Sequence, residues 1–171
     1  MPFTRTTACA DTCVLSDFIR AGRVELLWQL FPDGIWVDAS AVIELQTEFG
    51  SAVLDDIRSR GCEPLFERAF EDRHYLEMAE IKRRRPALRH PDIVCVVLAG
   101  MHGATCLSSD AAVRKTCQER GVSIAGQLGC LEQAVQRRLI SRAVATDLLR
   151  EFLTNGLYLP RALIADFLTR G

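Results

Sequence analysis

Short apolar segments alternate along this chain with segments whose apolar residues recur at helical spacing. The predicted strands are 7–11, 35–37, 63–66, 104–108 and 122–124. The helices that can be delimited are predicted at 39–48, 51–59, 72–84, 110–120, 128–138, 141–154 and 160–169, and shorter helical patterns follow residues 11 and 22. Because strands joined through helices run parallel and are covered on both faces, this order predicts an α/β fold with three layers, α/β/α, around a central parallel sheet.

One segment, 91–100, fits either kind of element. Its β-branched residues favour a strand, whereas Pro91 in a first turn, followed by Asp92, favours the start of a helix. Gly103 is a plausible helix stop, and 104–108 is the better strand. The context therefore predicts a helix at 91–100.

The chain shows no internal repeat, low-complexity segment or linker, so one domain is expected over 1–171. Within it, 1–126 forms the α/β core and 127–171 a wholly helical C-terminal extension. The apolar fraction of 49% suits a folded protein that can rest on its core. There is neither an apolar run long enough for a membrane span nor a basic N-terminus followed by an apolar stretch, and a cytoplasmic protein without membrane contact is expected.

The charge balance and the cysteines exclude several classes of function. Net charge is −1, so a globally basic surface for non-specific nucleic-acid binding is absent. The seven cysteines are scattered, with no Cys-x-x-Cys pair, and are expected to be free, buried thiols rather than disulfides or zinc ligands. No signature of a covalent hydrolase or of a phosphate-binding glycine loop is present.

Four acids stand where a parallel sheet can bring them together. Asp11 and Asp110 follow two predicted strands, Glu44 lies on a helix after the second strand, and Asp92 begins a helix. Carboxyl ends of parallel strands meet at one edge, and clustered carboxylates need cations. Mg²⁺ or Mn²⁺ prefers such oxygen ligands and can activate water against a phosphodiester. Spacing alone is weak support, because the chain has 22 acids.

A basic stretch precedes the third acid. Within it, Arg84, Arg85 and Arg89 could receive a nucleic-acid backbone running toward the metal site. The alternative is a solvated face that balances the nearby Glu77 and Glu80.

The local sequence around each acid resembles, in order, the four acidic motifs of the PIN-domain nucleases. These motifs are Asp11-Thr-Cys-Val-Leu15, Val42-Ile-Glu44-Leu45, Pro91-Asp92-Ile93 and Leu107-Ser-Ser-Asp110-Ala-Ala-Val-Arg114. The tail, with Gly126-Gln-Leu-Gly129-Cys-Leu131, Arg137-Arg-Leu-Ile140 and Gly156-Leu-Tyr-Leu159, looks like the C-terminal extension of a subgroup close to the VapC-type toxin ribonucleases of bacterial toxin-antitoxin pairs.

The resemblance implies a PIN-like fold, metal-dependent cleavage of RNA, homodimers and inhibition by a small protein antitoxin whose tail enters the acidic site. Carried over, the four acids would hold Mg²⁺ or Mn²⁺ or orient the attacking water, and Ser108 would match a hydroxyl residue often found beside the fourth acid. Members of the subgroup often carry Glu in the third motif, so Glu77 or Glu80 could replace Asp92. The family also usually places a small residue such as Ala near the position of Cys95.

Other interpretations of the same residues stay open. Asp11 and Asp110 could only cap the helices that follow them, Glu44 could be a solvated acid, and Asp92 could only favour a helix dipole. The whole chain could be a catalytically weak PIN-like module that binds RNA or a protein through its C-terminal helices, or a nuclease directed at DNA.

Overall fold

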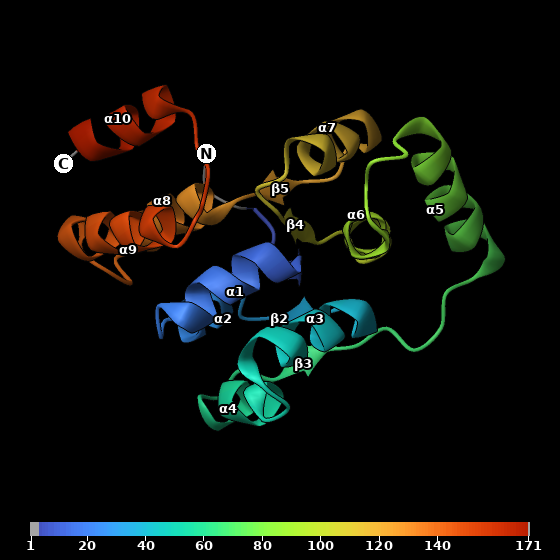
Figure 1. The fold of residues 1–171 in the computed structure, drawn as a ribbon, viewed down its shortest axis with the longest axis horizontal. Coiled ribbons are helices and arrows are strands. Elements are labelled where there is room, and N and C mark those ends of the chain that lie inside the picture. The colour runs from blue at the N-terminus through green and yellow to red at the C-terminus, as the bar shows by residue number, and fades with distance from the viewer. Residues whose placement is uncertain (1–3, 171) are drawn as a thin grey trace.

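A computed structural model describes residues 4–170 and contains a parallel sheet of five strands. The strands are β1 (Thr7–Ala10), β2 (Gly34–Trp36), β3 (Pro64–Leu65), β4 (Thr105–Leu107) and β5 (Ile124–Ala125). Their order in the sheet is β3-β2-β1-β4-β5, and every neighbouring pair is parallel. The strand that comes first in the chain is therefore the central one (Figure 1).

Ten helices surround the sheet in the described part of the chain. They are α1 (Thr12–Arg20), α2 (Glu25–Leu30), α3 (Ala39–Phe49), α4 (Val53–Ser59), α5 (Asp72–Arg84), α6 (His90–Met101), α7 (Ala111–Arg120), α8 (Gln127–Gln136), α9 (Arg142–Thr154) and α10 (Arg161–Thr169). The predicted α/β fold with a central parallel sheet and a helical C-terminal part is confirmed. Within residues 4–170, none of the helices has the length and apolar character needed to cross a bilayer.

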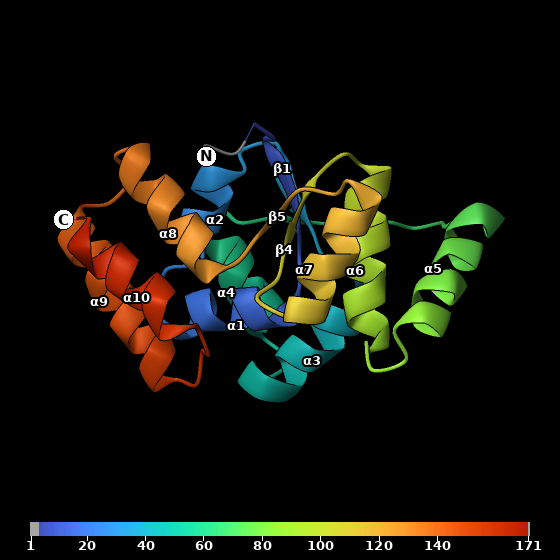
Figure 2. The ribbon, with the colours of Figure 1, turned by 90° about the horizontal axis from the view of Figure 1, so that it is seen from above.

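The alternation of side chains along the strands divides the apolar interior into two cores. Ala8 and Ala10 of β1 face the larger core, which they share with α1–α4 and α8–α10. Cys9 points to the other face and packs with α5, α6 and α7. Successive side chains of a strand point to opposite faces, so a sheet with apolar residues at consecutive positions must be covered on both. The three layers follow from this (Figures 1 and 2).

The C-terminal helices share the larger core. Phe152 of α9 is fully buried and meets Phe18 of α1 with ring centroids 5.0 Å apart. Phe167 of α10 is also buried, and the guanidinium of Arg142 lies 4.8 Å from its ring centroid. In Figure 2, α8–α10 gather at one end of the molecule and α5 stands at the other.

Two details of the sequence prediction concern the element limits. Segment 91–100 is helical, as predicted, within α6. The last strand was expected at 122–124 but spans Ile124–Ala125, because the N–H of Val122 is still bonded to the carbonyl of Cys117 at the end of α7 (2.9 Å). All seven cysteines are free; six are buried and Cys13 is half-buried, which confirms their prediction as buried thiols.

Candidate active site

The carboxyl ends of β1 and β4 define the candidate site. Connections from β1 lead to β2 on one side, and β4 lies on the other, so the strand order reverses between β1 and β4. Parallel α/β proteins bind ligands in the crevice at such a switch point. Asp11 directly follows β1, and its N–H donates to the carbonyl of Leu107 at the end of β4 (3.0 Å). The first candidate acid is thus held at the switch point by backbone bonding.

Asp11 does not act as a side-chain cap. It occupies the N-cap position of α1, but its carboxylate makes no cap hydrogen bond. Instead its Oδ2 accepts bonds from the hydroxyl of Ser108 (3.0 Å) and the thiol of Cys13 (3.2 Å). The other oxygen, Oδ1, is buried and has no hydrogen-bond partner among residues 4–170. A buried carboxylate oxygen without a donor is costly, so Oδ1 is suited to a cation.

The pKa of the Cys13 thiol is raised at this site. Burial, and secondly the negative charge of Asp11, raise the pKa of Cys13 to about 12. Cys13 therefore stays protonated at neutral pH and acts as a hydrogen-bond donor to Asp11 rather than as a nucleophile.

Asp92 is the second buried acid, with 7% of its surface exposed. Its Oδ2 accepts the N–H of Arg89 at the start of α6 (2.9 Å). Burial raises the pKa of Asp92, the charges of Asp11 and Asp110 raise it further, and the Arg89 N–H bond and charge oppose the shift. The charges of Asp11 and Asp110 thus both act on the Asp92 carboxyl.

Glu44 lies on the other side of the site and is held by an ion pair. Its Oε1 accepts from Arg89 Nη1 at 3.0 Å, and the same guanidinium lies 3.8 Å from Asp92 through Nε. Glu44 is half-buried on the wall of an open cleft, so part of its carboxylate still meets solvent. Arg89, predicted to bind substrate, neutralises two of the candidate acids.

Asp110 is exposed and does cap the helix that follows. Its Oδ1 accepts the N–H groups of Ala112 (2.7 Å) and Val113 (2.9 Å). The capping interpretation is therefore realised here, although a second oxygen of the carboxylate remains. Asp11, Asp92 and Asp110 all stand at helix N-termini, where the helix dipole stabilises negative charge.

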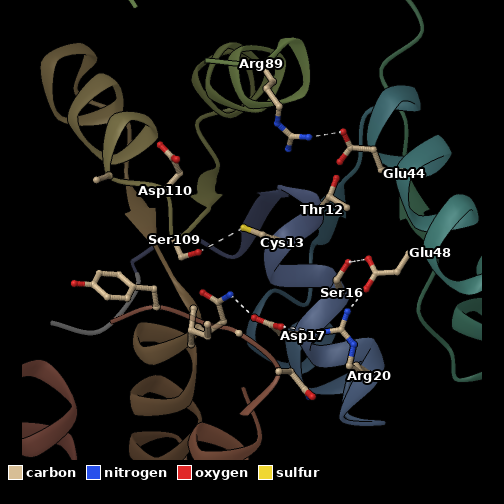
Figure 3. A pocket seen from close by; sticks show the side chains of 16 residues that line it. Thr12, Cys13, Ser16, Asp17, Arg20, Glu44, Glu48, Arg89, Ser109 and Asp110 are labelled. Atoms are coloured by element: carbon tan, nitrogen blue, oxygen red, sulfur yellow. Dashed lines mark hydrogen bonds and ion pairs between the residues drawn. The ribbon is translucent and has the colours of Figure 1, made fainter. Parts of the chain in front are cut away.

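A cleft of about 540 Å³ opens beside these residues. Glu44, Arg89 and Asp110 line it, whereas Asp11 and Asp92 are buried and do not. Figure 3 shows Glu44 and Asp110 on opposite sides of the first turn of α1, with Arg89 reaching toward Glu44. The cleft thus has carboxylates on both sides, which could bind a metal ion, and the Arg89 guanidinium, which could bind a phosphate group.

The remaining basic candidates lie elsewhere. Arg84 pairs with Glu80 (2.7 Å), and Arg85 pairs with Glu119 (2.6 Å). Both arginines line a small hollow between α5 and α7, not the carboxylate cleft. Glu77, the other replacement considered for Asp92, pairs with Arg120 at 2.7 Å. The structure brings none of these residues to the switch point.

A polar network in the cleft was not anticipated from the sequence. Asp17 of α1 accepts from Gln127 of α8 (2.6 Å) and lies 3.5 Å from Arg20. Glu48 of α3 accepts from Ser16 (2.7 Å) and pairs with Arg20. The one available signal in the sequence was Asp17 itself, an acid inside the apolar pattern of α1. In the structure Asp17 is buried, and the bond from Gln127 satisfies it there.

The donor set fits a hard divalent cation. It consists of carboxylate oxygens, which Mg²⁺ and Mn²⁺ prefer, and it includes the unpartnered Oδ1 of Asp11. Among residues 4–170, no three His, Cys, Asp or Glu side chains are already gathered closely enough to hold a metal ion. Asp11 is the residue best placed to bind one, because its Oδ1 has no hydrogen-bond partner in the described part of the chain.

Replacing Asp92 by Asn is expected to stabilise the metal-free protein at neutral pH. The raised pKa means that the folded state binds the proton more tightly than the unfolded state, so wild-type stability falls as pH rises from the usual Asp pKa through the raised value. Asp92→Asn removes this loss, so at neutral pH its Tm should lie above that of wild type.

The measurement is thermal unfolding in chelator between pH 3 and pH 8. The advantage of Asp92→Asn should shrink as the pH falls below the usual Asp value. Asp72→Asn is the matched control, because Asp72 stands in the first turn of α5 but is exposed. Equal Tm values for wild type and Asp92→Asn across this range would contradict the expectation.

The parallel α/β/α fold and the acids at its switch point define the class of this protein. Comparison with known protein families identifies the family. The sequence model of a family described as PIN domain matches residues 7–170. The chain therefore belongs to the PIN-domain family. PIN domains are typically nucleases that use divalent metal ions, which makes nucleic acid the substrate class. The searches of curated proteins and of solved structures returned no significant match.

Proposed function

We propose that this protein is an endoribonuclease that depends on Mg²⁺ or Mn²⁺ and hydrolyses RNA phosphodiesters with water as the nucleophile. The observation that carries the proposal is the Asp11 carboxylate, which is buried at the switch point with Oδ2 bonded by Ser108 and Oδ1 without a partner. A side chain that served only stability would have both oxygens satisfied or exposed.

In this proposal the role of each acid follows from its position in the site. Asp11 and Asp92 are the buried ligands, and Ser108 fixes the orientation of Asp11. Glu44 and Asp110, on the walls of the cleft, complete the ligand set or orient the attacking water. A divalent ion bound by these acids would supply an activated water and would neutralise charge on the phosphodiester. No nucleophilic side chain is required.

Arg89 is the substrate-binding residue of this proposal. It lines the cleft, and its side chain is 63% exposed while its guanidinium pairs with Glu44. A guanidinium can bind phosphate oxygens through two parallel hydrogen bonds. Arg84 and Arg85, which were candidates for the same role, would meet only RNA that extends beyond the cleft toward α5.

The finer parts of the proposal rest on the likeness of the motifs and tail to the toxin subgroup. They are a role as the toxin of a toxin-antitoxin pair, neutralisation by a small protein antitoxin and a homodimer; a cytoplasmic location is proposed beside them, from the sequence pattern alone. They also include one PIN-like domain over residues 1–171, to which the shared core of α1 and α9 lends support.

The test is cleavage of labelled single-stranded and structured RNAs, with matched DNA and hybrid substrates. Wild-type protein should be refolded after denaturing purification, which removes any bound inhibitor, and assayed with Mg²⁺, Mn²⁺ or chelator. We expect RNA cleavage with either metal and none in chelator. Cleavage confined to DNA would make the protein a DNA-directed nuclease. RNA binding without cleavage in every metal would favour a binding module.

A further inference from the structure

A second hollow adjoins the carboxylate cleft. It measures about 610 Å³ and lies between the start of α7, β5, the start of α8 and the segment that joins α9 to α10. The residues shared by the walls of both cavities are Ser109, Ala111, Gln127 and Tyr158. The rest of the second wall is largely apolar, with Ile124, Leu128, Leu159, Pro160 and Leu163. A nucleic-acid strand bound in the cleft can therefore place its neighbouring nucleotide in this hollow.

Tyr158 stands between the two cavities and is 86% exposed. Its neighbours Leu157 and Leu159 pack against the larger core, which leaves the ring between them outside it. An exposed tyrosine that contributes so little to the core offers an unoccupied aromatic face. Aromatic rings at the wall of a nucleic-acid site stack on unpaired bases.

Gln127 provides independent evidence that the hollow binds a ligand. It is 1% exposed, and its Nε2 donates to Asp17 at 2.6 Å. A carboxylate oxygen accepts, so the amide nitrogen of Gln127 faces Asp17, whose other oxygen lies 3.5 Å from Arg20, and the amide oxygen is left on the other side. Gln127 Oε1, in turn, is buried and has no hydrogen-bond partner in the described part of the chain. A buried amide acceptor on the wall of two cavities is satisfied by a ligand that brings a donor.

We propose that the second hollow, which we call the base subsite, holds an unpaired nucleobase of the RNA next to the phosphodiester in the cleft. Tyr158 stacks on the base, and Gln127 Oε1 accepts a hydrogen bond from an N–H on its edge. Arg114, exposed on the same wall, neutralises an adjoining phosphate. This proposal rests on the proposed function. It adds that the RNA substrate has an unpaired nucleotide beside the phosphodiester that is cleaved.

The test measures binding of fluorescent single-stranded RNA in chelator, where cleavage is absent. Tyr158→Ala is expected to weaken binding about tenfold, the usual effect of losing one stacked base. Tyr158→Phe should bind like wild type. Gln127→Met keeps the volume but removes the acceptor together with the Nε2 donor to Asp17, so its Tm is measured beside wild type, and its RNA binding should weaken about fivefold. Tyr75→Ala is the matched control, because Tyr75 is 57% exposed on the remote helix α5.

A set of RNAs with one abasic position each, cut by wild-type protein with metal and bound in chelator, completes the test. One position should weaken wild-type binding about tenfold and have no further effect on Tyr158→Ala, since the stacking partner is already gone. If wild type cleaves RNA but Tyr158→Ala binds normally, the base subsite is wrong and a protein segment is the better occupant. If wild type neither binds nor cleaves RNA, the proposed function fails and the base subsite with it.

Discussion

The Asp11→Asn protein is expected to fold normally and to lose RNA cleavage by more than about 100-fold. Losing a residue that merely orients a metal ligand typically costs about 10- to 100-fold, so losing the ligand itself should exceed this range. Asn is the same size as Asp and can still accept the Ser108 hydroxyl through its oxygen, which keeps the local structure. The measurement is the initial rate of RNA cleavage in Mn²⁺.

A second measurement separates metal binding from activity. Mn²⁺ should raise the Tm of wild type, because a ligand that binds only the folded state stabilises it, and should raise the Tm of Asp11→Asn much less. Ser108→Ala should lose about 10- to 100-fold in rate. Asp33→Asn is the control, since Asp33 is exposed in the turn before β2. Metal-dependent cleavage retained by Asp11→Asn would falsify the assignment of Asp11.

The largest effect on stability is expected from Phe152→Ala. Phe152 is fully buried and joins α9 to α1 through its contact with Phe18. Truncating a buried Phe to Ala typically costs about 3–5 kcal/mol, through lost burial and the cavity left behind. In a domain of this size the loss corresponds to a fall in Tm of about 6–20 °C.

Thermal unfolding followed by circular dichroism measures this fall. Leu168→Ala is the matched control on α10, because Leu168 is 42% exposed and its truncation should change stability by less than about 0.5 kcal/mol. If Phe152→Ala unfolds no earlier than Leu168→Ala, the C-terminal helices do not share their stability with the α/β core. In that case the region 127–171 would behave as a separate unit.

Most of the fold could be predicted because its signals are local. Asp38, for example, caps α3 by accepting the Ser40 N–H (2.9 Å), and Gly121 ends α7 in the left-handed conformation with φ of 68°. Helix α6 was harder, because Asp92 to Ala99 are all buried and show no helical periodicity. A helix sandwiched between a sheet and other helices loses the polar face that reveals it.

The candidate site could be predicted only in part. Asp11 and Asp110 follow strands, so sheet geometry brings them together, and no further information is needed. Whether each acid is free to bind a cation depends on contacts the sequence does not contain, such as Ser108 bonded to Asp11 across 97 positions. Gln127 and Asp17, which are 110 positions apart, were missed for the same reason.

Arg89 gives the site an internal counter-ion. One guanidinium is shared by Glu44 on α3 and Asp92 on α6, so it offsets repulsion between carboxylates from two different helices. A phosphate that drew Arg89 away would expose negative charge on both acids, and a bound cation would in turn release Arg89 for phosphate. Binding of the two ligands is then thermodynamically linked, each increasing the affinity for the other by the same factor.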